Sequence, residues 1–218
     1  MKAFFVKLFS GLISLITPIL LVLTVVRLLL TPVFLQIEYH LPAFPPDQFG
    51  FSQQDRLYWS GFALDYLLND QGIEFLGNLK FENGNPVYNQ RELQHMIDVK
   101  VVVQKVLLVW YALIAFFILV GILAWKTGTW GDFRLALANG GLFTIILLAL
   151  VIIFVLIGFG MFFVAFHNVF FTPGTWTFLW SDTLIRLFPE RFWRDAFLFA
   201  SGLAMILGWV LWRCGKRV

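Results

Sequence analysis

Hydrophobic positions along this chain gather into four long runs, separated by polar or proline-rich stretches. The runs cover about residues 11–31, 100–125, 135–166 and 194–213. Each is long enough to cross about 30 Å of hydrocarbon as a helix, which rises about 1.5 Å per residue. The pattern therefore predicts an all-α polytopic membrane protein with four transmembrane helices, forming a single membrane domain over residues 1–218.

The stretch between the first two runs, residues 32–99, has the polar sequence expected of a small domain outside the hydrocarbon. Ser52 followed by Asp55 forms a capping-box pattern, so we expect a short helix to begin there. Residues 83–86, Asn-Gly-Asn-Pro, lie between apolar flanks and predict a small β-hairpin. A second polar loop, residues 167–193, is expected to contain a short interfacial helix.

Lysine and arginine near the ends of the runs indicate how the chain is oriented in the membrane. Basic residues lie before the first run, between the second and third, and after the fourth, whereas residues 32–99 are mainly acidic. We therefore expect both termini in the cytoplasm and the loops 32–99 and 167–193 on the extracytoplasmic face. The basic residues that carry this prediction are Lys2, Lys7, Lys126, Arg134, Arg213, Lys216 and Arg217.

Composition changes this picture only by excluding some classes of function. The chain is 60% hydrophobic and 13% charged, with a mean hydropathy of +0.81 and a net charge of +3. The net positive charge comes from the cytoplasmic ends, which face anionic lipid, and the chain has no basic stripe with interleaved aromatics, which argues against nucleic-acid binding. A single cysteine, Cys214, excludes an internal disulfide. The motifs of serine hydrolases, phosphate loops and dinucleotide-binding folds do not occur.

Two histidines are candidate catalytic groups because the predicted topology brings them to the same depth. Counting residues along two antiparallel helices from the turn near Gly128 places His95 and His167 at nearly equal height, at the outer interface. Two imidazoles there can act as acid and base on a lipid ester, whose carbonyls lie at that depth. The alternative is that each histidine is only an interfacial hydrogen-bonding group. His40, in a loop without a helical partner, is expected to be structural, and no metal-binding spacing surrounds any of the three.

Two stretches of sequence resemble a known family. Residues 88–100 read YNQRELQHMIDVK, and residues 166–171 read FHNVFF, followed by GTW and then by LFPERFW at 187–193. Together they are similar to the bacterial lipoprotein intramolecular transacylase family, called Lit. The resemblance implies transfer of the sn-2 acyl chain of a diacylglyceryl-modified lipoprotein to the α-amino group of its N-terminal cysteine, leaving a lyso-form lipoprotein. It also implies a bacterial cell membrane location, no cofactor, and essential histidines that match His95 and His167.

The same resemblance suggests a mechanism. We interpret His95 as the base that removes a proton from the substrate amine, while the other histidine returns one to the departing glycerol oxygen. Glu92 or Asp98 would orient the base, and Arg91, Asn168 or backbone amides would face the oxyanion. Two further residues are expected to contact the lipoprotein substrate, Tyr88 and Trp176.

Two other functions fit the sequence. One is a non-catalytic membrane scaffold or partner subunit, whose outer domain binds protein. The other is an acyltransferase that acts on a different membrane lipid.

Overall fold

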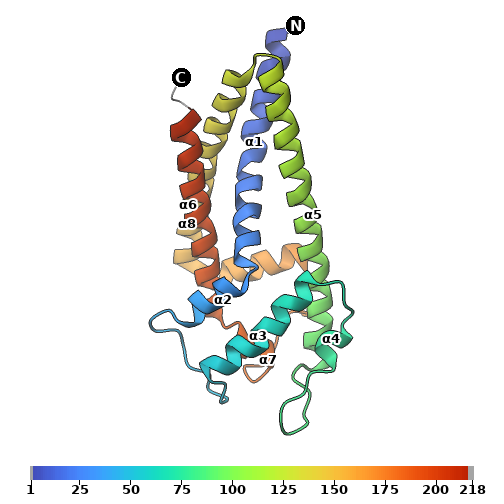
Figure 1. The fold of residues 1–218 in the computed structure, drawn as a ribbon. Helices are drawn as coiled ribbons and strands as arrows, with labels where there is room; N and C mark the ends of the chain where they lie inside the picture. Colours follow the sequence, from blue (N-terminus) through green and yellow to red (C-terminus); the bar gives the residue numbers. More distant parts are fainter. Residues whose placement is uncertain (1, 216–218) are drawn as a thin grey trace. The chain divides into compact units, whose positions relative to one another are not determined.

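The computed structural model describes residues 2–215, with side chains from Lys7 onward. Lys216 and Arg217 of the predicted basic tail, and the side chain of Lys2, lie outside the described residues. Four of the described helices are long and apolar enough to cross a membrane, so the predicted number of spans is confirmed. The helices are α1 (Lys2–Leu29), α2 (Pro32–Tyr39), α3 (Gln53–Leu68), α4 (Glu74–Gly77), α5 (Gln90–Lys126), α6 (Trp130–Phe170), α7 (Thr183–Leu187) and α8 (Glu190–Gly215), as Figure 1 shows.

One compact unit is built from α1 up to Arg27, α5 from Leu107, α6 up to Ile157 and α8 from Phe197. Its buried core gathers side chains of α1, α5 and α6 around Phe117. These segments supply most of the apolar helix length of the chain, as expected for the membrane-spanning part.

Small residues let the helices of this unit approach each other closely. A side chain on Gly208 of α8 would lie 2.7 Å from the carbonyl oxygen of Gly141 in α6. A side chain on Gly140, next along α6, would lie 2.5 Å from Thr17 of α1. Helices in lipid gain little from hydrophobic burial, so close backbone packing of this kind is what holds them together.

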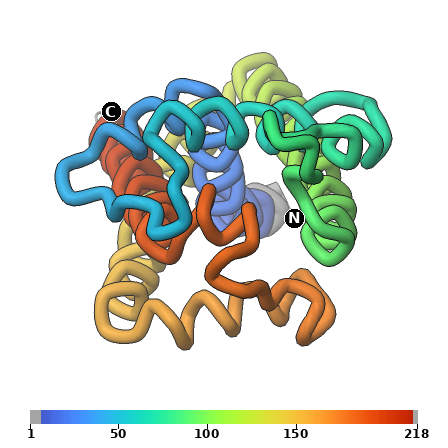
Figure 2. The backbone as a smooth tube through the Cα atoms, turned by 90° about the horizontal axis from the view of Figure 1, so that it is seen from below, coloured from blue at the N-terminus to red at the C-terminus, as the bar shows by residue number. Residues whose placement is uncertain are grey.

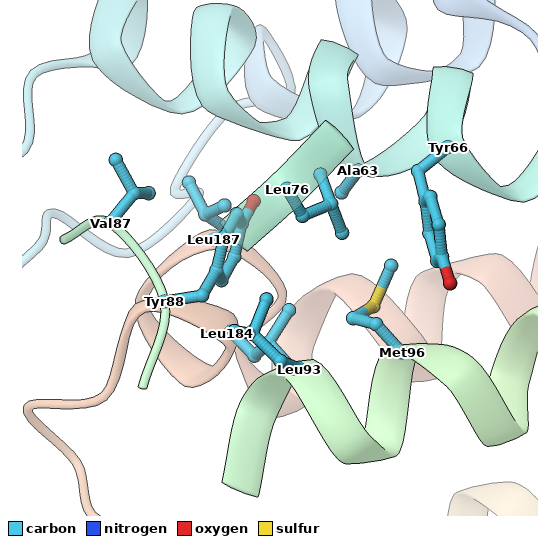
Figure 3. Close-up of a cluster of buried hydrophobic side chains, with 9 residues drawn as sticks. All are labelled: Ala63, Tyr66, Leu76, Val87, Tyr88, Leu93, Met96, Leu184 and Leu187. Atoms are coloured by element: carbon cyan, nitrogen blue, oxygen red, sulfur yellow. The ribbon is translucent and has the colours of Figure 1, made fainter. Parts of the chain in front are cut away.

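The other unit comprises Leu28–Val106 and Gly158–Ala196, and it contains α2, α3, α4, α7 and the adjoining ends of α5, α6 and α8. Within it, α3 packs against α2, α4 and α7. Side chains from α3, α4, α5 and α7 meet in one apolar cluster, shown in Figure 3, where Leu76 and Leu187 are completely buried. Both candidate histidines belong to this unit.

The predicted short helix after Ser52 is confirmed as α3. Its capping box is complete, because the Ser52 hydroxyl accepts from the Asp55 N–H at 3.1 Å and the Asp55 carboxylate accepts from the Ser52 N–H at 2.8 Å. The loop that leads from α2 into α3 is visible in Figure 2. It is fixed to α7 by a buried ion pair of 2.9 Å between Asp47 and Arg186.

The predicted β-hairpin is wrong. Among the described residues, this region holds one isolated bridge between Lys80 and Pro86, with a further backbone bond of 3.0 Å from the Val87 N–H to the Leu79 carbonyl. Pro86 has no N–H to donate, so the pairing does not extend into a ladder. The turn itself forms, with Gly84 at a φ of +82°, but strands do not follow from it.

The third predicted span differs from the observed helix in extent. α6 runs beyond the predicted 135–166 at both ends, and its backbone leaves helical geometry at Gly158, where φ is −154° and ψ is 63°. The predicted interfacial helix corresponds to α7, which has only five residues.

Candidate active site

A polar junction between the start of α5 and α7 positions the first histidine. Glu92 is 1% exposed, and its carboxylate accepts hydrogen bonds from the Asn89 N–H at 2.8 Å and from the Leu184 N–H at 2.7 Å. One carboxylate therefore caps the N-terminal ends of two helices. His95 lies three residues after Glu92, on the same face of α5. The junction that Glu92 makes with α7 therefore helps to fix the position of His95.

The structure brings together the two histidines that the sequence singled out. The ring centroids of His95, in α5, and His167, near the end of α6, lie 6.5 Å apart with an angle of 22° between the ring planes. Their exposed fractions are only 9% and 7%. Two nearly parallel imidazoles, both largely shielded from water, can exchange protons with a reactant that binds beside them.

Aromatic side chains surround both rings. Phe171 and Phe178 meet the His95 ring edge to face, at centroid distances of 5.0 Å and 5.4 Å. The rings of Phe163 and Trp176 lie 4.0 Å and 4.7 Å from that of His167. Such an environment excludes water and strengthens every charge interaction that forms inside it.

Hydrogen bonds distinguish the two histidines. Nδ1 of His167 lies 2.8 Å from the carbonyl oxygen of Phe163, so this nitrogen carries the proton and Nε2 is left with a lone pair. Nδ1 of His95 is buried and has no partner among the described residues, and the same holds for Nε1 of Trp176. Buried polar atoms without partners are costly, so these two atoms mark where a polar ligand would be accommodated.

The other predicted site residues lie around the histidines without bonding to them. Arg91 is exposed and forms an ion pair of 3.5 Å with Asp182. Asn168 is exposed, Asp98 is half-buried, and Tyr88 is buried in the apolar cluster. In the part of the chain that the structure describes, none of these side chains forms a hydrogen bond with either imidazole.

The aromatic surroundings of the histidines were not predicted, although part of them had a signal. Phe163 and Phe171 stand four residues before and after His167, and this spacing places side chains on one helical face. Phe178 and Trp176 lie in an irregular loop, where no periodicity shows which side chains turn inward. Only the folded chain reveals their contacts with the imidazoles.

Among the described residues, the histidine pair is not part of a metal-binding cluster. No three His, Cys, Asp or Glu side chains gather to hold a metal within the described residues. A groove of about 910 Å³ belongs to the other unit, where apolar residues of α1, α5 and α6 form most of its walls. Neither histidine lines this groove, so the buried imidazoles define the candidate site better.

Comparisons with known proteins agree with the fold. The solved structure of lipoprotein intramolecular transacylase Lit from Bacillus cereus shares the fold at a TM-score of 0.58 and 23% identity, covering 96% of each chain. A variant of the same protein with a histidine replaced by arginine matches at a TM-score of 0.53 and 22% identity, covering 98% of this chain and 95% of that one. An uncharacterized protein of Aquifex aeolicus (strain VF5) is 29% identical over 209 residues, which are 93% of this chain and 90% of the relative. The family model of lipoprotein intramolecular transacylase Lit matches residues 11–193, and the chain belongs to this family of membrane transacylases.

Proposed function

We propose that this chain transfers the sn-2 acyl chain of a diacylglyceryl-modified lipoprotein to the α-amino group of the lipoprotein's N-terminal cysteine. The observation that carries the proposal is the pair of buried imidazoles, His95 and His167, with ring centroids 6.5 Å apart in a chain of the Lit family. The reaction takes place at the extracytoplasmic face of a bacterial cell membrane and needs no cofactor.

The hydrogen bonds of the two rings favour His167 as the base. Its Nδ1–H is engaged by the Phe163 carbonyl, which leaves Nε2 to take a proton from the attacking amine. This reverses the assignment expected from sequence, in which His95 was the base. The imidazolium of His167 then returns its proton to the departing glycerol oxygen through the neighbouring ring of His95, which takes up one proton as it passes another on.

Intramolecular transfer suits a site of this kind because amine and ester belong to one substrate molecule. Holding them together supplies a large effective molarity, so no covalent acyl-enzyme is required. The aromatic rings around the imidazoles keep water out, which favours attack by the amine over hydrolysis.

The exposed polar residues fit the polar part of the substrate. We assign Arg91 and Asn168 to the peptide or head-group side, since both are exposed beside the buried imidazoles. Glu92 holds the two helices in place through its backbone bonds, and Tyr88 supports it from the apolar cluster. Asp98 is half-buried one turn further along α5 than Gln94, and we assign its carboxylate a supporting role beside His95.

The decisive experiment is expression in a bacterium that lacks lipoprotein N-acylation, with mass spectrometry of the N-terminal peptide of an abundant lipoprotein. We expect a peptide with one fatty acid on the amine and one on the glycerol. His95→Ala and His167→Ala should each lower its yield by orders of magnitude while remaining folded in the membrane. His40→Ala is the matched control, because His40 is exposed and makes the same bond from Nδ1 to the carbonyl four residues earlier, at 2.7 Å.

Two results would point to the alternative functions. An unmodified diacylglyceryl peptide from well-expressed protein, with acyl transfer found on another membrane lipid, would identify a different acyl acceptor. Loss of binding to a protein partner, with no acyl transfer in any lipid fraction, would identify a scaffold.

A further inference from the structure

We infer that the indole N–H of Trp176 donates the hydrogen bond that stabilises the oxyanion formed from the ester carbonyl of the substrate. This role rests on the proposed acyl transfer and adds to it the group that faces the developing negative charge.

The surroundings of Trp176 support this role. Its ring lies 4.7 Å from that of His167, the proposed base, and 6.2 Å from that of Phe163. Its Nε1 is buried and meets no acceptor among the described residues. Leaving such a donor unpaired in a buried site is costly, so an acceptor supplied by the substrate recovers a penalty that the free protein carries.

A second unpaired atom lies on the histidine next to His167. Nδ1 of His95 is also buried without a partner, and the His95 ring is the neighbour of His167. Within the described chain, the Trp176 N–H and the His95 Nδ1 both lack a hydrogen-bond partner, and both rings neighbour the proposed base, His167. Together they match the carbonyl oxygen and the leaving oxygen of an ester.

The other donors expected to face the oxyanion are less suited to it. Arg91 has 61% of its side chain exposed and is paired with Asp182, and Asn168 is exposed. A hydrogen bond to an oxyanion stabilises most where water is excluded, and Trp176 is the predicted substrate residue that offers a buried donor there.

The chemical step balances without any further reactant. The amine nitrogen bonds to the ester carbon and passes its proton to His167, while the carbonyl electron pair moves to oxygen and accepts the bond from the Trp176 N–H. The pair then returns to re-form the carbonyl, the bond to the glycerol oxygen breaks, and that oxygen takes up a proton relayed from the His167 imidazolium through His95, so both imidazoles end neutral. The products are an amide and a free glycerol hydroxyl.

The test compares purified Trp176→Phe with wild type on a synthetic diacylglyceryl lipopeptide. Removing one oxyanion donor typically lowers kcat by about 10²–10³-fold, and we expect a loss of this size with KM changed only a few-fold. Trp59→Phe is the matched control, because Trp59 packs against Phe81 and Phe62 beside the apolar cluster of Figure 3. This substitution should leave kcat within a few-fold of wild type.

A tetrahedral inhibitor separates a donor to the oxyanion from a purely structural role. A lipopeptide with a phosphonate in place of the sn-2 ester should bind Trp176→Phe more weakly by about the same factor as the loss in kcat. An uncleavable ether analogue should bind both proteins alike. Unchanged kcat in Trp176→Phe, or equal weakening of both analogues, would overturn the role of Trp176 while leaving the transacylase function standing. Absence of product with wild type would instead reject the proposed function.

A second variant keeps the test decisive if Trp176→Phe does not fold. Trp176→Tyr retains an aromatic ring and a donor, so it should keep kcat well above that of His167→Ala and keep the preference for the phosphonate. Folded Trp176→Tyr without that preference would count against the proposed donor.

Discussion

At the scale of single residues, Glu38 shows how a buried charge couples this fold to pH. Its side chain is completely buried, and neither carboxylate oxygen receives a hydrogen bond in the described chain. Burial first, and then the negative charge of nearby Asp195, raise the pKa of Glu38 from 4.5 to about 7, against the opposing effect of Arg191. The protonated carboxyl can donate to Asp195, which itself pairs with Arg191.

A pH dependence of stability follows from this shift. A carboxyl whose pKa is higher in the folded than in the unfolded chain stabilises the fold fully below pH 4.5, and this contribution is lost as pH rises through 7. The loss amounts to about 3 kcal/mol for a shift of this size. Glu38→Gln should therefore unfold at a nearly constant temperature between pH 5 and pH 8 in detergent, where wild type becomes less stable. Glu82→Gln, at an exposed position, should follow wild type, and a wild-type curve that is flat would contradict the shift.

At the scale of elements, the sequence was sufficient to predict those elements that form from residues close together in the chain. α3 followed from a cap and an apolar pattern within 16 residues, and the four spans followed from length and hydropathy. The hairpin prediction was wrong because a turn sequence does not ensure strand pairing. Pro86 has no backbone N–H to donate to a ladder. The cap that Glu92 gives to α7 joins residues 92 positions apart, so no local pattern indicated it.

The junction made by Glu92 gives a prediction about two elements at once. In Glu92→Gln a single amide oxygen replaces two carboxylate oxygens, so one of the N–H groups of Asn89 and Leu184 loses its acceptor. We expect a loss of about 1–3 kcal/mol in stability, measured by thermal unfolding in detergent, together with reduced acyl transfer. Asp98→Asn is the control. In the described chain the Asp98 carboxylate accepts only a long hydrogen bond of 3.5 Å, from the Gln94 side chain, so its loss of charge removes no cap. Equal loss in both variants would show that charge, rather than the cap, is what matters.

At the scale of the whole molecule, chain topology and side-chain contacts were predictable to different degrees. Similar helix lengths on either side of the turn near Gly128 were enough to expect His95 and His167 at nearly the same depth. Which nitrogen of each ring is engaged, and that Trp176 lies against His167, depend on packing between segments far apart in sequence. The proposed base and the proposed oxyanion donor both rest on those contacts, so the sequence indicated a candidate site without indicating its chemistry.

Orientation in the membrane is a property of the whole chain that the single cysteine can report. Lys126 and Arg134 flank one turn and Arg213 precedes the C-terminal end, which predicts that Cys214 faces the cytoplasm. Cys214 is exposed, so a membrane-impermeant maleimide should label it in inverted vesicles and leave it unlabelled in intact cells. In a Cys214→Ser background, Asn83→Cys in the exposed turn of the 32–99 loop should give the opposite pattern. If Asn83→Cys were labelled only in inverted vesicles, the histidine-bearing unit would face the cytoplasm, and a lipoprotein acylated on the outer surface could not be its substrate.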